Sequence, residues 1–103
     1  MKKTRSRNIK VVLGIAWYRR EQWLLLKSAS VDADEMHDSY DEWVDSAEKA
    51  FSCMRKEEKN VLKVVVDVEE LIDWCRKENC PVDSSARARF VNHKLKDRKK
   101  SNR

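Results

Sequence analysis

The sequence predicts a helix-dominated α+β domain, or a small α/β domain, with two strands and about four helices. Two short stretches are rich in Val, Ile and Leu, while the segments between and after them repeat apolar residues every three or four positions. One Gly and one Pro in 103 residues leave few tight turns, which disfavours an all-β fold. A chain of this length is expected to form one domain around a single modest core.

The first predicted strand covers Ile9–Trp17, because large apolar side chains alternate along it. The opposite face is small and mostly apolar, and Gly14 within it favours close packing of a helix, with a β-bulge as the alternative. A short helix is predicted next, over residues 19–29, with Trp23, Leu24 and Leu26 on its buried side.

The clearest periodicity in the chain predicts a long helix over residues 34–56. Its apolar residues recur at spacings of three and four, at Met36, Tyr40, Trp43, Val44, Ala47, Ala50, Phe51 and Met54. Asp32 is predicted to cap its first turn by accepting hydrogen bonds from unpaired amides. Acids gather in the first half of this helix and bases in the second, which suits the helix dipole.

The second predicted strand, Val61–Asp67, is nearly continuous in Val and Leu, as expected for a strand buried on both faces. Asp67 then begins a capping box for a helix over residues 68–79, and a last helix follows over 84–96. Because roughly 44 residues separate the strands, a crossover with parallel pairing is expected. Two strands make a marginal sheet, so either helices cover both of its faces or edge strands join in a dimer.

The ends of the chain are predicted to differ from its middle. We expect a basic flexible leader at residues 1–8, a single globular domain at 9–96 and a basic flexible tail at 97–103. Three cysteines without a secretory signature, and no apolar stretch near the ~20 residues of a membrane span, predict a cytoplasmic protein without a membrane partner. No phosphate-binding glycine loop occurs, and no cofactor or metal is predicted.

Charge is sorted along the chain into two basic ends and an acidic middle. Residues 1–30 and 86–103 each carry +7, whereas residues 31–48 carry −8. Clustered Lys and Arg are the electrostatic footprint of phosphate-backbone binding. The candidate phosphate contacts are Lys2, Lys3, Arg5, Arg7, Lys96, Arg98, Lys99 and Lys100. The preferred prediction is therefore a non-enzymatic protein that binds an anionic macromolecule, nucleic acid included, without sequence specificity.

Two other functions stay open at this point. The acidic residues at 34–48 share a predicted helix, which is typical of a solvated face but also suits a basic protein partner or a homodimer. Alternatively, Tyr18, Arg19 and Arg20 follow a predicted strand, where ligands of open α/β sheets bind, and could form the anion site of a small enzyme. The simpler explanation of the two arginines is that they pair with nearby carboxylates.

Three segments of the sequence carry a resemblance to known proteins. Gly14–Trp23, Tyr40–Trp43 and Asp67–Arg89 together resemble small bacterial proteins of unknown function. The resemblance covers about residues 11–95 and leaves both ends outside. It implies a bacterial cytosolic protein and no particular activity, so no functional residues are transferred from it.

Overall fold

The computed structural model describes residues 12–57 and 59–101, with side chains described through residue 97. In this part of the chain the elements are β1 (Leu13–Trp17), η1 (Arg20–Gln22), α2 (Trp23–Ala29), η2 (Ala33–Glu35), α3 (Tyr40–Lys56), β2 (Val61–Val65), α4 (Val68–Lys77) and α5 (Ser84–Ser101). The predicted helix-dominated α+β architecture is confirmed. None of these helices combines the length and the hydropathy that crossing a lipid bilayer requires.

The sheet consists of β1 and β2 in parallel, with Leu13 opposite Val61 and Trp17 opposite Val65. The predicted crossover between parallel strands is therefore confirmed. Both strands are shorter than predicted: β2 ends at Val65, β1 begins at Leu13, and residues 9–11 lie outside the described part of the chain. Since these are the only strands among the described residues, each strand has one edge without a strand partner.

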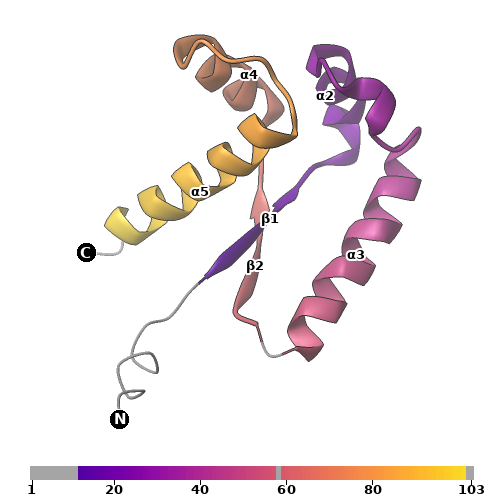
Figure 1. Cartoon of the computed structure of the whole chain (residues 1–103), viewed down its shortest axis with the longest axis vertical. Coiled ribbons are helices and arrows are strands. Elements are labelled where there is room, and N and C mark those ends of the chain that lie inside the picture. The colour runs from indigo at the N-terminus through magenta and orange to yellow at the C-terminus, as the bar shows by residue number, and fades with distance from the viewer. Residues whose placement is uncertain (1–11, 58, 102–103) are drawn as a thin grey trace.

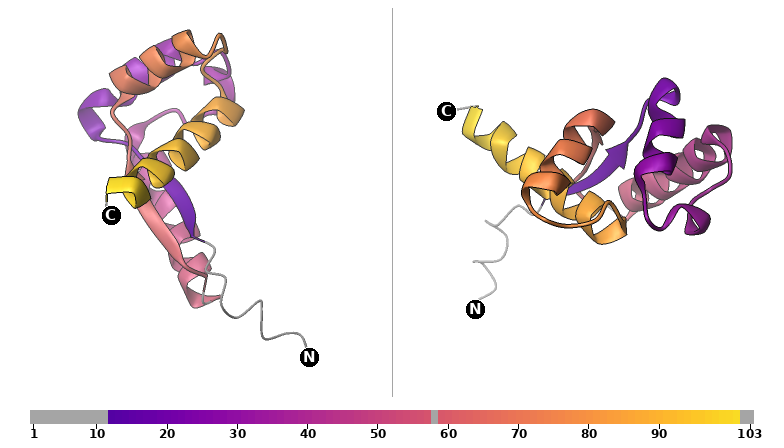
Figure 2. Two further views of the ribbon diagram at one scale, coloured as in Figure 1. Left: turned by 90° about the vertical axis from the view of Figure 1, so that its left-hand side faces the viewer. Right: turned by 90° about the horizontal axis from the view of Figure 1, so that it is seen from above.

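Helices cover the two faces of this small sheet from opposite sides (Figure 1). Gly14 faces α5 so closely that a Cβ atom on it would lie 2.6 Å from Val91 Cγ1. Trp17 lies on the other face, and its ring packs edge-on against Trp43 of α3 at 5.3 Å between centroids. The remaining helices, α2 and α4, lie beyond the carboxyl ends of the strands (Figure 2).

The core lies where these elements meet. Its largest fully buried side chains are Phe90, Leu26, Leu71, Val64, Val66, Val68 and Cys75, so α2, α4, α5 and β2 all contribute to it. Complete burial of a large aliphatic or aromatic side chain stabilises a fold by roughly 1.5–3 kcal/mol. A shared apolar core of this kind holds α2, α4 and α5 in fixed positions around the carboxyl ends of the strands. Leu24, predicted on the buried side of the short helix, is instead 80% exposed, because it lies on the face of α2 that points away from this core.

The long helix begins at Tyr40 rather than at residue 34. Ser39 caps it, because its hydroxyl accepts a hydrogen bond from the Glu42 amide at 3.1 Å. Residues Ala33–Glu35 form a single 3-10 turn instead. Asp32 does not cap this turn through its side chain. Its carboxylate is held by α5, so the predicted cap at Asp32 is wrong.

The start of α4 agrees with its predicted cap. The Asp67 carboxylate accepts from the amides of Glu69 and Glu70, as a helix N-cap does. The side chain of Glu70 does not complete a capping box, because it is paired with Lys94 of α5 at 2.8 Å. α4 ends at Lys77, and Asn79 adopts a left-handed conformation with φ of 58°.

The last helix is longer than predicted. α5 continues to Ser101 instead of ending near residue 96. Lys and Arg are good helix formers, and His93 lies one turn before Asp97, with 3.5 Å between His93 Nε2 and the carboxylate. Most of the segment predicted as a tail therefore has a helical backbone.

Replacing Gly14 with Ala is expected to lower the free energy of unfolding by about 1–3 kcal/mol. The new methyl group would lie 2.6 Å from Val91 Cγ1 and 2.9 Å from Leu95 Cδ1, too close for atoms that are not bonded. Urea unfolding followed by tryptophan fluorescence measures the loss. Adding Val91→Ala should recover part of it, and strictly additive effects of the two substitutions would contradict the close contact between β1 and α5.

Candidate functional site

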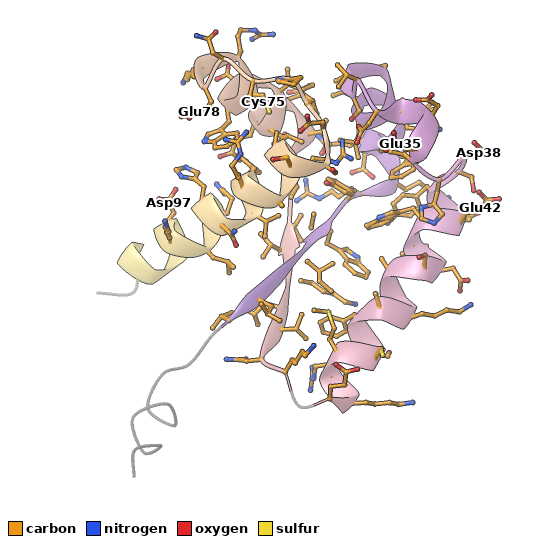
Figure 3. The ribbon with its side chains drawn as sticks, in the orientation of Figure 1. Glu35, Asp38, Glu42, Cys75, Glu78 and Asp97 are labelled. Atoms are coloured by element: carbon orange, nitrogen blue, oxygen red, sulfur yellow. The ribbon has the colours of Figure 1, made fainter. Side chains whose placement is uncertain are left out.

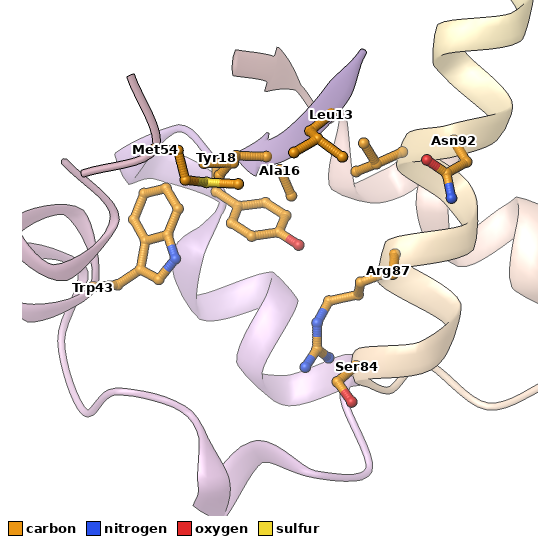
Figure 4. A pocket seen from close by; sticks show the side chains of 12 residues that line it. Leu13, Ala16, Tyr18, Trp43, Met54, Ser84, Arg87 and Asn92 are labelled. Atoms are coloured by element: carbon orange, nitrogen blue, oxygen red, sulfur yellow. The ribbon is translucent and has the colours of Figure 1, made fainter. Parts of the chain in front are cut away.

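A groove of about 540 Å³ runs along the free edge of β1, between α3 and α5 (Figure 4). Leu13, Ala16 and Tyr18 lie on the β1 side of it. α3 contributes Trp43 and Met54, and α5 contributes a row of residues from Ser84 through Arg87 to Asn92. The groove is mostly apolar along the strand and polar at the end where α5 begins.

The backbone of β1 presents unused hydrogen-bonding groups to this groove. In a parallel pair, alternate residues of a strand direct both their N–H and C=O groups to the partner strand. Leu13 N–H donates to Asn60 O at 2.8 Å and Trp17 O accepts from Val66 N–H at 2.9 Å, so Leu13 and Trp17 face β2. Gly14 and Ala16 alternate with them and direct their groups to the groove, where no strand of the described residues pairs with them.

An ion pair between Asp32 and Arg87 closes the polar end of the groove. The Arg87 guanidinium donates to both Asp32 oxygens, at 3.0 and 2.8 Å, and to Ser30 Oγ at 3.1 Å. The Asp32 carboxylate also accepts from the Ser84 amide at the start of α5, at 3.1 Å. Only 13% of the Arg87 side chain and 15% of the Asp32 side chain are exposed. The hydrogen bonds from Arg87 lower the pKa of Asp32, which stays ionised at neutral pH.

An aromatic cluster, which includes Tyr18 and Trp43, forms the wall of the groove beside this ion pair. Tyr18 packs against Trp43 at 5.3 Å between ring centroids and against Trp23 at 6.5 Å. The Tyr40 hydroxyl donates to the Tyr18 carbonyl oxygen at 2.9 Å, which fixes the chain just after β1. Burial raises the pKa of Tyr18 to about 12, so its hydroxyl stays protonated at neutral pH.

A smaller cavity of about 210 Å³ adjoins the groove, and Tyr18, Trp43 and Arg87 line both. The cavity is also bordered by Glu35 and His37, so the acidic segment reaches the carboxyl end of β1 at this point. Trp23 lines the cavity too. Its indole Nε1 is buried without a hydrogen-bond partner among the described residues.

The residues of the predicted anion site are placed apart. Tyr18 is buried, whereas Arg19 and Arg20 are exposed. Arg20 donates to Asp41 at 2.7 Å and lies over the Tyr40 ring at 4.8 Å. The pKa of Asp67 is lowered mainly by the Glu70 amide, and the charge of Arg19 adds to this effect. Arg20 thus pairs with a carboxylate, and the Tyr18 ring lines the groove.

The candidate phosphate contacts fall into two groups. Lys96 is exposed on α5, and the backbone places Arg98, Lys99 and Lys100 on the turns that follow it. Lys2, Lys3, Arg5 and Arg7 lie outside the described residues. The C-terminal half of α5 projects away from the other elements in Figure 1 and in the right-hand view of Figure 2.

The described His, Cys, Asp and Glu side chains bear on two other chemistries, metal binding and thiol reactivity. No three of the described His, Cys, Asp and Glu side chains are grouped to hold a metal ion. Burial, and then a hydrogen bond with the Cys80 sulfur, raise the pKa of Cys75 to about 11. The Cys75 thiol is therefore protonated at neutral pH and packs as a small apolar side chain.

Sequence reasoning missed the groove and the ion pair. Asp32 and Arg87 are far apart in the sequence, and neither belongs to a motif that would link them. The alternation along Ile9–Trp17 predicted the strand but not which of its edges would stay open. Comparison with protein-family models, with curated proteins and with solved structures gave no match to this chain.

Replacing Arg87 with Met is expected to lower the free energy of unfolding by about 3 kcal/mol, because Asp32 would remain mostly buried without its partner. Urea unfolding at neutral pH measures the loss. Equal unfolding midpoints for Arg87→Met and the unaltered chain would contradict this role of the pair.

The Asp32–Arg87 pair should also make the free energy of unfolding depend on pH. Arg87 lowers the pKa of Asp32 in the folded chain. The stabilisation is therefore complete above the ordinary Asp pKa of about 3.9 and is lost as the pH falls toward the lower folded value. In the Asp32→Asn variant, stability should depend less steeply on pH in this acid range.

Proposed function

We propose that the protein is a non-enzymatic binding protein that contacts an anionic macromolecule, nucleic acid included, through the basic end of α5. The supporting observation is the projection of this helix beyond the rest of the molecule (Figure 1). Lys96, Arg98, Lys99 and Lys100 follow one another on its final turns. Phosphate contacts of this kind position a protein on a duplex but carry no sequence information, so we expect weak selectivity.

The cations nearer the start of α5 have other partners. Arg87 is paired with Asp32, Lys94 is paired with Glu70, and the Arg89 guanidinium lies 5.5 Å from the centre of the Trp74 ring. Lys96 is exposed. The end of the helix therefore supplies the charge for an external partner. The helix that carries most of the acidic segment, α3, lies on the opposite side of the sheet from α5 (Figure 1).

Reversing two charges at this end, with Lys96→Glu and Lys100→Glu, is expected to weaken binding to a DNA duplex. The slope of log affinity against log salt concentration should become shallower by about 2, because each lost phosphate contact removes about 0.9. Fluorescence anisotropy with a labelled duplex over a salt series measures both quantities. Lys49→Glu with Lys56→Glu on α3 changes the net charge equally and serves as the control. Equal losses in the two variants would show that only net charge matters.

A second function is favoured by the acidic segment, residues 34–42, which we propose binds another protein. Glu35, Asp38 and Glu42 gather near the start of α3 (Figure 3). They and Asp34 are exposed, and no ion pair within the described part of the chain involves any of the four. Exposed acids without counter-charges attract a cationic partner over about a Debye length.

Neutralising part of the acidic segment, with Asp38→Asn and Glu42→Gln, is expected to weaken binding of a polylysine peptide several-fold at low salt. Isothermal titration calorimetry measures the affinity. The matched control is Glu69→Gln with Glu78→Gln, which removes two exposed acids from the neighbourhood of α4. The proposal fails if the two double variants bind the peptide equally well.

A further inference from the structure

We infer that two copies of this chain associate by antiparallel pairing of their β1 strands across the groove. This inference rests on the proposed protein-binding role of the acidic segment, residues 34–42. The partner of that segment is then the basic leader of a second copy, residues 1–8. The free edge of β1 supplies the hydrogen bonds, and charge complementarity selects the occupant.

The edge is suited to strand addition. The N–H and C=O groups of Gly14 and Ala16 face the groove, and no strand among the described residues pairs with them. A two-stranded sheet is marginal by itself, and an open edge is a template for another strand. Pairing two copies about a two-fold axis at Ile15 places Gly14 of each copy opposite Ala16 of the other. The result is a continuous four-stranded sheet, with the same surface used on both sides.

Charge favours a second copy as the occupant. Residues 1–11 include five cations, Lys2, Lys3, Arg5, Arg7 and Lys10. In an antiparallel pair, the chain that precedes β1 of one copy leaves the sheet at the carboxyl end of β1 in the other. At that end Glu35 and Tyr18 border the same cavity, and the acidic segment continues from there to Glu42. Each copy thus offers five cations to the exposed acids of its partner, and both contacts form at once.

The helices beside the groove leave room for this arrangement. The α5 residues along the groove include Ser84 and Ala88, which are small and exposed. Small side chains allow two helices to approach closely over a shared sheet. The dimer uses the basic leader and leaves the end of α5 free. The two ends of the chain would then have different partners: the leader a second copy, and α5 the anionic macromolecule.

The mass of the full chain in solution tests the pairing directly. Size-exclusion chromatography with light scattering should give twice the 12.2 kDa of one chain at low salt. Two variants separate the contacts. The first reverses the leader, with Lys2, Lys3, Arg5 and Arg7 all changed to Glu. The second reverses the acidic segment, with Asp34, Glu35, Asp38 and Glu42 all changed to Lys. Each variant alone should be monomeric, and an equimolar mixture of the two should form heterodimers, identified by native mass spectrometry.

A third variant tests the strand edge itself. Ala16→Pro removes an N–H group that faces the groove and is not bonded to β2, and proline is tolerated on the open side of an edge strand. This variant should keep its circular dichroism spectrum and become monomeric. If this variant fails to fold, the two charge-reversal variants still show whether the dimer forms. A control mixes the leader-reversed chain with a chain carrying Glu69→Lys and Glu78→Lys. It should give far less heterodimer than the charge-reversal pair, because only one of its two leader contacts joins opposite charges.

The outcomes distinguish the pairing from the function on which it rests. A wild-type chain that stays monomeric at every concentration overturns the dimer, as does a charge-reversal mixture that stays monomeric. If the monomer still binds polylysine through Asp38 and Glu42, the protein-binding role of the acidic segment stands without the dimer. If neither dimer nor peptide binding is found, both proposals fail.

Discussion

Parallel pairing of β1 with β2 is the constraint on which the rest of the structure depends. Parallel strands need a long crossover connection, and here that crossover carries α2, η2 and α3 before the chain returns as β2. The same geometry directs the backbone groups of Gly14 and Ala16 away from β2. It also places the acidic segment, residues 34–42, at the carboxyl end of β1. The groove and its charged end are therefore consequences of the strand topology.

The Asp32–Arg87 pair fixes α5 to the crossover connection between the two strands. Its guanidinium and carboxylate join the loop after α2 to the beginning of α5, and the Ser84 amide adds a third contact. A mostly buried pair contributes little net stability over an apolar pair but is costly to break, so it acts chiefly to fix one arrangement. The first turns of α5 are thus held in the fold by this pair, whereas its basic last turns extend beyond the other elements.

Much of the fold could be predicted from local patterns in the sequence. The alternation along Ile9–Trp17 and the Val-rich second strand gave the two strands, and the length between them gave parallel pairing. The start of the long helix could not be predicted, because Asp32 resembles a cap locally but bonds to a residue far along the chain. Side-chain direction could not be predicted for the site either. Tyr18, Arg19 and Arg20 are neighbours in the sequence, but Tyr18 is buried while both arginines are exposed.

Amide hydrogen exchange along β1 measures directly whether this strand has one paired edge and one open edge. In dilute protein we expect slow exchange at Ile15 and Trp17, whose amides face β2, and fast exchange at Gly14 and Ala16, whose amides face the groove. Slow exchange at all four amides in dilute protein would show that the edge is already covered within one chain and that β1 has no open edge.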